Sequence, residues 1–203
     1  MKETGQVIVC AYKNLPHGFS VDWKKLFEWL CHERWSCEKV FFYTGLEAGN
    51  DALINEFDAI SKLPCSVVRT KWYQVFKRKD KTVQIKCAKC GEENVKVVDM
   101  GYAKKANCDV DLTMDILENA TIDPEVEMMI MTGDGDFTPL IRKVSDIAKK
   151  IYIVSSQKRF EKARMIKGRF STKLRDLINE KCDRITFIEI NNWKMKIKRD
   201  ITT

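Results

Sequence analysis

The chain has 203 residues, of which 44% are hydrophobic and 32% charged, and its net charge is +7. This length fits one ordinary domain, and the composition favours a packed core over disorder. No apolar run approaches the roughly 20 residues that span a bilayer, and the N-terminus has no signal-peptide core. We therefore expect a cytoplasmic protein with no membrane partner. The positive excess favours a polyanionic partner such as nucleic acid, although the solvated faces of a Lys-rich protein would give the same charge.

Short apolar runs alternate with amphipathic stretches along the chain. In chain order, the pattern predicts a strand at 7–10, a helix at 22–35, a strand at 40–43, a helix at 51–63, a strand at 66–69, a hairpin formed by 82–85 and 95–98, a helix at 109–119, a strand at 128–131, a helix at 138–149, a strand at 151–154, a helix at 174–180 and a strand at 185–190. This alternation indicates a three-layer α/β fold with a mainly parallel sheet. We expect a single domain over 1–203, with a hairpin insertion at about 71–99 and a basic C-terminal extension at about 156–203.

Two acidic clusters stand out. In "MTGDGDFTPL", Asp134 and Asp136 come directly after the strand predicted at 128–131. Sites in open α/β sheets form beyond the carboxyl ends of the strands, so these two residues are expected at the functional edge. The second cluster, "NCDVDLTMD", holds Asp109, Asp111 and Asp115 at the start of a predicted helix. Like charges at Asp111 and Asp115 repel at helical spacing, and a bound cation would remove that conflict.

Oxygen ligands of this kind suit Mg²⁺ or Mn²⁺. One or two such ions activate water and stabilise the leaving oxygen in phosphodiester cleavage. The alternative is structural. Gly-Asp-Gly-Asp is also a turn composition, and Asp136 lies where it would cap the helix predicted at 138–149. Spacing alone leaves both interpretations open.

A Cys-x-x-Cys pair lies between the two strands of the predicted hairpin. Cys87 and Cys90 are followed by a glycine, as in a zinc knuckle. A structural Zn²⁺ site needs four ligands, however, and Cys65 and Cys108 would contribute only if the fold brought them close. The sequence therefore favours a reduced cysteine pair, with zinc as the alternative. The remaining cysteines are scattered and indicate free thiols.

Basic residues concentrate in several stretches that are candidates for RNA binding. In "KWYQVFKRK", the aromatic residues Trp72, Tyr73 and Phe76 are interleaved with lysines and an arginine. Such mixing suits single-stranded RNA, whose bases stack on rings while phosphates meet cations, and it suits an ordinary amphipathic edge strand as well. The candidate RNA-binding residues are Lys13, Lys77, Arg78, Lys79, Lys158, Arg159, Arg164 and Arg169.

Three segments resemble motifs of NYN-domain proteins of the LabA-like group, within the PIN-like nuclease superfamily. "TGDGDFTPLIRKV" resembles their S/T-G-D-x-D-F-x-P-L motif, and "KKANCDVDLTMDIL" is similar to their K-G-V-D-V-D-L-x-x-D stretch. "VIVCAYKNLPHG" resembles their first strand and its D-G-x-N-L turn. The resemblance covers about residues 6–155. It implies a Rossmann-like PIN fold and divalent-metal-dependent ribonuclease activity.

The resemblance also implies roles for individual residues. Asp109, Asp134 and Asp136 correspond to the metal-binding acids, and Asn14 corresponds to the polar residue of the first turn. Asp111 would be an alternative or supporting ligand. Thr132 would orient ligands or substrate. One departure matters: the first aspartate of the family falls at Ala11, whose methyl group cannot coordinate a metal.

The main hypothesis is therefore a divalent-metal-dependent endoribonuclease that is impaired in this chain at Ala11. The alternative is a catalytically inactive RNA-binding or protein-assembly module of the same fold, and a homo-oligomer is compatible with either. A small-molecule phosphoesterase would use the same acidic edge, but it would leave the basic stretches unexplained.

Overall fold

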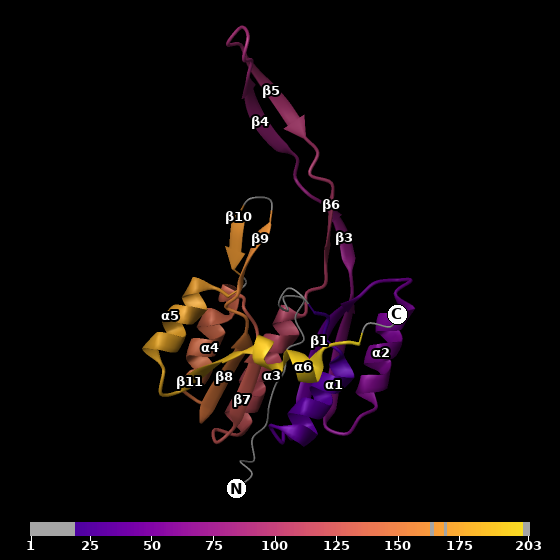
Figure 1. Cartoon of the computed structure of the whole chain (residues 1–203), viewed down its shortest axis with the longest axis vertical. Coiled ribbons are helices and arrows are strands. Elements are labelled where there is room, and N and C mark those ends of the chain that lie inside the picture. The colour runs from indigo at the N-terminus through magenta and orange to yellow at the C-terminus, as the bar shows by residue number, and fades with distance from the viewer. Residues whose placement is uncertain (1–18, 163–164, 169, 201–203) are drawn as a thin grey trace.

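The computed structural model describes residues 19–162, 165–168 and 170–200, with the backbone alone for 159–162 and 165–168. An α/β body carries a long, two-stranded arm and a shorter second ribbon, and both project from the same side of the body (Figure 1). No helix within the described residues has the length and apolarity needed to cross a membrane.

From residue 19 onward the elements follow one another in the alternating order that the sequence predicts, whereas the strand predicted at 7–10 lies outside the described residues. The helices are α1 (Trp23–Glu28), which continues as one π-helical turn (Trp29–Glu33), α2 (Asp51–Ser61), α3 (Asp109–Ile122), α4 (Thr138–Ser145), α5 (Thr172–Glu180) and α6 (Lys194–Ile197). The strands are β1 (Val40–Leu46), β2 (Ser66–Trp72), β3 (Gln74–Lys77), β4 (Lys81–Lys86), β5 (Glu93–Val98), β6 (Tyr102–Lys105), β7 (Glu127–Met131), β8 (Lys150–Ser155), β9 (Arg159–Lys162), β10 (Met165–Gly168) and β11 (Ile185–Glu189). Short 3-10 turns cover Gly135–Phe137 and Ile190–Trp193.

All strand pairs of the body are parallel, as predicted. Within the described residues these strands form two sheets: β1 pairs with β2 in one, and β8 lies between β7 and β11 in the other. Because β11 belongs to this sheet, the segment after residue 156 that we expected to be an extension contributes a strand to the body. The described ribbons are antiparallel: β3 pairs with β6, β4 with β5, and β9 with β10.

Alternate residues of the strands point to opposite faces, which gives the body its three layers. Phe41 and Ile130 pack in one core with the apolar sides of α3, α4 and α5. Their chain neighbours Phe42 and Met131 pack in a second core with α1, α2 and α6. Strands buried on both faces read as continuous apolar runs, which is why they were recognisable in the sequence.

Two helices end earlier than their periodicity predicts. The helix predicted at 22–35 is α-helical only to Glu28 and closes with a π-helical turn. The helix predicted at 138–149 ends at Ser145. There the backbone N–H of Lys149 donates to the carbonyl of Val126 at 3.1 Å, so the chain has already left the helix to enter β8. Apolar periodicity continues through such turns because their side chains still face the core.

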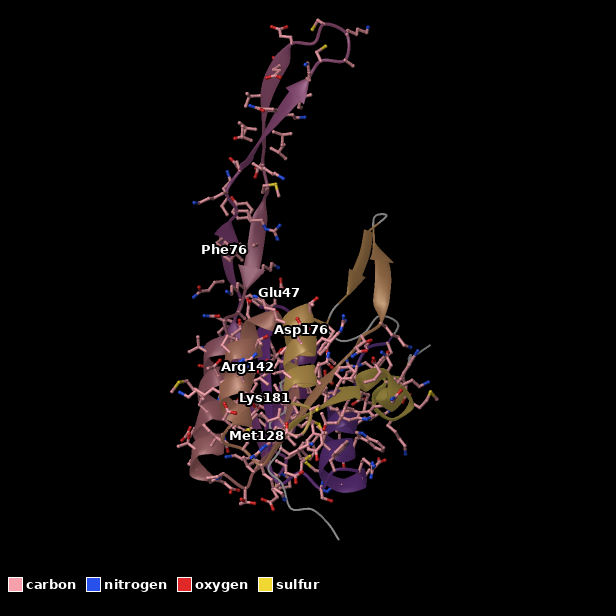
Figure 2. The ribbon with its side chains drawn as sticks, turned by 90° about the vertical axis from the view of Figure 1, so that its left-hand side faces the viewer. Glu47, Phe76, Met128, Arg142, Asp176 and Lys181 are labelled. Carbon is pink, nitrogen blue, oxygen red and sulfur yellow. The ribbon has the colours of Figure 1, made fainter. Side chains whose placement is uncertain are left out.

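The hairpin predicted around the cysteines is present and forms the outer part of the arm. Strands β4 and β5 pair from Lys81–Val98 to Lys86–Glu93, and β3 with β6 forms the part next to the body. The side chains of β3 and β4 are exposed throughout, and they stand out into solvent on both sides of the arm (Figure 2). The arm therefore runs from Gln74 to Lys105 and begins directly after β2.

Candidate active site at the carboxyl edge of the sheet

The first acidic cluster lies in the turn that follows β7. The Asp134 carboxylate accepts a hydrogen bond from the backbone N–H of Asp136 at 2.9 Å, and the buried hydroxyl of Thr132 accepts one from the N–H of Asp134 at 3.2 Å. Asp134 thus caps the short turn Gly135–Phe137, while buried Phe137 anchors the turn in the core. The stretch thus forms a turn, as we considered, but Asp136 does not cap the following helix, because α4 begins without a side-chain cap. The Asp134 side chain caps the turn and also lines a pocket.

A contact with α5 holds this turn tightly. The backbone N–H of Ser171 donates to the carbonyl of Gly133 at 3.0 Å. A Cβ atom at Gly135 would lie 2.3 Å from the Ser171 hydroxyl oxygen, which is closer than real Cβ atoms approach. Glycine at position 135 therefore lets the turn lie against the start of α5, which fixes the backbone that carries both aspartates.

The second acidic cluster begins α3. Asp109 is the first residue of this helix, and Cys108 precedes it without a side-chain cap. Asp109, Asp134 and Asp136 line one open pocket of about 540 Å³ between α3 and α4. The rest of its wall is mainly apolar and includes Val110, Met114, Leu117, Pro139 and Leu140. The fold thus brings to one pocket the three aspartates that the family resemblance implies as metal ligands.

Negative charge is concentrated at this pocket. Burial raises the pKa of Asp109 above its ordinary value, Lys105 opposes that rise, and the charges of Asp134 and Asp136 add to it. The direction shows that the negative neighbours and the loss of solvent together outweigh the nearby lysine. A positive ion bound there would reverse this balance, since an opposite charge favours the ionised carboxylate.

The three carboxylates do not by themselves converge on one point. Among the described residues, no three His, Cys, Asp or Glu side chains lie close enough together to hold one metal ion. Two of the predicted site residues, Ala11 and Asn14, lie outside the described part of the chain. The oxygen ligands that the pocket offers, three carboxylates and the Thr113 hydroxyl, still fit a hard cation such as Mg²⁺ or Mn²⁺.

Asp111 lies in a neighbouring pocket, away from the other predicted ligands. Its carboxylate is paired with Lys71 at 2.7 Å. This second pocket is lined by Asp111 and Asp115 of α3 and by Arg69 and Thr70 of β2. For Asp111 to hold a metal, its ion pair with Lys71 would have to open.

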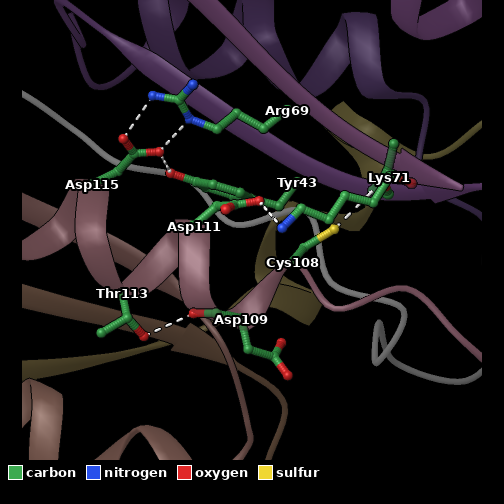
Figure 3. Close-up of polar contacts among 9 residues, drawn as sticks. Tyr43, Arg69, Lys71, Cys108, Asp109, Asp111, Thr113 and Asp115 are labelled. Carbon is green, nitrogen blue, oxygen red and sulfur yellow. Dashed lines mark hydrogen bonds and ion pairs between the residues drawn. The ribbon is translucent and has the colours of Figure 1, made fainter.

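Asp115 is the most buried of the acidic residues near the site, with a relative exposure of 5%. Arg69 donates two hydrogen bonds to it, at 2.5 and 2.7 Å, and the Tyr43 hydroxyl donates a third at 2.6 Å. Burial by itself would raise the pKa of Asp115, but these bonds outweigh it, and the pKa lies below its ordinary value. Figure 3 shows this cluster, with the Asp109 carboxylate pointing away from it. Asp115 therefore joins α3 to the sheet.

The predicted RNA-binding residues are distributed over both ribbons. Lys77, Arg78 and Lys79 are exposed at the junction between the inner and outer halves of the arm, and Lys158 is exposed between β8 and β9. For Arg159 only the backbone is described. Lys13, Arg164 and Arg169 lie outside the described residues.

Sequence reasoning missed three residues that shape the site. Lys143 lines the acidic pocket, Lys105 acts on the charge of Asp109, and Arg69 holds Asp115. Lys105 lies four residues before Asp109 in the sequence, and Lys143 lies seven residues after Asp136 on α4, and this proximity was the available signal. Arg69 carried none, because its partner lies 46 residues away in the sequence.

Parallel strands between layers of helices, with aspartates gathered beyond the carboxyl end of β7, are the features of a PIN-like α/β domain. The NYN domain family model matches residues 7–174, so this chain belongs to the NYN domain family. That family falls in the PIN-like nuclease superfamily, whose members are in general hydrolases.

Among solved structures, a protein of unknown function from Vibrio parahaemolyticus, VPA0982, is similar, with a TM-score of 0.53 and 18% sequence identity over 92% of this chain and 94% of that one. At this identity the likeness supports the fold alone. A phosphofructokinase-2 mutant from Escherichia coli matches with a TM-score of 0.40 and 13% identity over 75% of this chain and 55% of that one. No curated protein sequence matches the chain significantly.

Proposed function

We propose that this chain has the architecture of a divalent-metal-dependent endoribonuclease of the LabA-like group, impaired at Ala11. The observation that carries the proposal is the pocket at the carboxyl edge, which Asp109, Asp134 and Asp136 line together. Family membership supports hydrolysis of a phosphodiester. The raised pKa of Asp109 supports a need for positive charge at this place.

These three aspartates would hold Mg²⁺ or Mn²⁺, which would supply a Lewis acid for activating water and neutralising phosphate charge. Other residues of the chain would position the carboxylates and the phosphate of the substrate. The turn held by Thr132 fixes Asp134 relative to Asp136. Lys143, at the wall of the same pocket, offers a cation to a phosphate oxygen. The apolar wall between α3 and α4 excludes water from one side of the pocket.

RNA as the substrate is supported by the arm that leaves this same edge. Lys77, Arg78 and Lys79 are exposed there, and the aromatic side chains of Trp72 and Phe76 are 60% and 47% exposed. Cations beside exposed aromatic rings suit a single strand, because phosphates meet the cations while bases stack. Residues of the arm would thus guide RNA toward the acidic pocket.

Restoring the missing carboxylate tests the catalytic proposal. The variant Ala11→Asp should cleave single-stranded RNA in Mn²⁺ at least about tenfold faster than the parent chain, because loss of even an outer-shell partner of a metal costs roughly 10–100-fold. Cleavage of a labelled RNA is followed on denaturing gels. The matched control adds Asp134→Asn to the restored chain and should return cleavage to the parent level. If Ala11→Asp leaves several RNAs intact in Mg²⁺ and Mn²⁺, the catalytic proposal fails.

A second candidate function is favoured by Ala11 itself: an RNA-binding or assembly module without catalysis. Such a module would hold RNA with equal affinity in EDTA and in Mn²⁺. Fluorescence anisotropy of a labelled RNA separates the two, since a metal-dependent enzyme should bind its substrate more tightly when the acidic pocket is neutralised.

A further inference from the structure

The tip of the arm forms a closed turn that presents two cysteines. The N–H of Cys87 donates to the carbonyl of Glu92 at 2.8 Å, and the N–H of Gly91 donates back to the carbonyl of Cys87 at 2.9 Å. Gly91 has a φ of 74°, a left-handed conformation that glycine adopts without strain. The backbone of the tip is thus fixed by its own hydrogen bonds, and Cys87 and Cys90 are fixed with it.

Cys87 and Cys90 have the Cys-x-x-Cys spacing of a pair of zinc ligands, and Gly91 follows them in the hydrogen-bonded turn. Both cysteines are free, and sulfur ligands select Zn²⁺ over the hard cations expected at the acidic pocket.

One tip supplies only half of such a site. Structural zinc is bound by four ligands in a tetrahedron. Within the described residues no third His, Cys, Asp or Glu joins Cys87 and Cys90. Cys108 lies at the start of α3 and donates to the carbonyl of Thr44, and Cys65 precedes β2. The arm carries its tip far from both (Figure 1).

A second copy of the chain offers the matching half. The ribbon next to the tip leaves aliphatic side chains uncovered on both faces: Val95 and Val97 on one face are 65% and 63% exposed, and Ile85 on the other is 45% exposed. An isolated two-stranded ribbon is marginally stable in water, so an identical ribbon packed against it would bury surface that each copy otherwise exposes. Because the arm projects from the body, two tips meet without a clash between bodies (Figures 1 and 2).

We propose that two copies of this chain join at the tips of their arms through one shared Zn²⁺, held by Cys87 and Cys90 of each copy. Binding forms four Zn–S bonds and releases the four thiol protons to solvent, with no change of oxidation state. Lys89 lies between the two cysteines in the sequence, so each copy would add a positive charge near the net negative zinc–thiolate centre. This inference is independent of the proposed nuclease activity.

The test measures zinc content and mass together. Full-length chain, stripped of metal under reducing conditions, is titrated with Zn²⁺ while light scattering after gel filtration gives its mass. The expected result is a twofold rise in mass that saturates at one zinc for two chains and is reversed by EDTA. Replacement of Zn²⁺ by Co²⁺ should give the intense absorption of a tetrathiolate centre.

Matched variants test whether the zinc-dependent dimer forms through the tip of the arm. The double variant Cys87→Ser/Cys90→Ser should stay monomeric and take up no stoichiometric zinc, whereas Cys65→Ser/Cys182→Ser, which removes two exposed thiols of the body, should behave as the parent. One zinc per monomeric chain, a zinc-independent dimer, or a dimer that survives EDTA but not reductant would each overturn the proposal. Circular dichroism of each variant checks that the fold is unchanged.

Discussion

Asp115 does not line the acidic pocket, but its hydrogen bonds fix the helix that carries Asp109. It lies on α3, one turn after Asp111, and it contacts Tyr43 of β1 and Arg69 of β2. These bonds join the sheet to the helix that begins with Asp109. In the sequence, Asp111 and Asp115 looked alike, because nothing local indicated which of them would face an arginine of a distant strand.

The charge of Asp115 should make stability depend on pH. Since its pKa in the folded chain lies below the ordinary 3.8, its contribution to the free energy of unfolding is present above about pH 4 and is lost as the pH falls through the folded-state value. The variant Asp115→Asn should lower the free energy of unfolding by roughly 1–3 kcal/mol near pH 7. It should lose less stability than the parent on acidification, as measured by urea unfolding at several pH values.

Asp111→Asn is the matched control for this prediction. Its ion pair with Lys71 is partly exposed, with side-chain exposures of 30% and 42%, and such pairs are worth about 0–1 kcal/mol. Equal losses for the two variants, or an unchanged acid limb for Asp115→Asn, would mean that the buried cluster does not anchor α3.

At the scale of elements, the question is whether the arm is an RNA-binding surface or only a spacer. Exposed Trp72 at the end of β2 and Phe76 on β3 lie where the arm meets the body, and Figure 2 shows Phe76 in that position. If RNA bases stack there, Trp72→Ala/Phe76→Ala should weaken binding of single-stranded RNA by roughly 1–3 kcal/mol for each lost base contact. Fluorescence anisotropy at fixed salt measures the change.

A still more exposed apolar residue of the body controls for surface hydrophobicity. Ile122 at the end of α3 is 74% exposed, and Ile122→Ala should leave RNA affinity unchanged. If the parent and the Trp72→Ala/Phe76→Ala variant bind single-stranded RNA with equal affinity, these rings do not stack on RNA bases.

The elements differ in how well the sequence predicts them. Buried strands such as β1 and β7 are set by runs of apolar residues, and helix α3 by its periodicity, so all were predicted. Strand β6 was not identified, and a strand over β3 was only one of two interpretations of that stretch, because every side chain of β3 is exposed and no burial pattern forms. Likewise, the position of Asp134 and Asp136 directly after β7 was enough to predict them at the site. The place of Lys143 in the pocket wall could not be predicted, because it depends on how α4 packs.

At the scale of the whole molecule, the body contains both hydrophobic cores, whereas the arm is a projecting surface. Neither hydrophobic core contains a residue of β3, β4, β5 or β6. The arm leaves and re-enters the body beside Gly45, where a Cβ atom would lie 2.6 Å from both Tyr73 and Ala106. The two ends of the arm are thus fixed by the body, whether or not the outer ribbon is present.

The outer arm should therefore be removable. Lys77 pairs with Tyr102, so residues 78–101 can be replaced by Asn-Gly, a dipeptide that closes two-residue hairpins. Because this segment contributes nothing to either core, the melting temperature should change by no more than about 4 °C, the shift that roughly 1 kcal/mol gives in a domain of this size. The shortened chain should keep the acidic pocket and Lys105, and it should lose zinc-dependent pairing.

Differential scanning calorimetry measures the melting temperature of the shortened chain, and light scattering with Zn²⁺ measures its pairing. A shortened chain that melts much lower would mean that the arm stabilises the body, and one that still pairs through zinc would move the shared site away from Cys87 and Cys90.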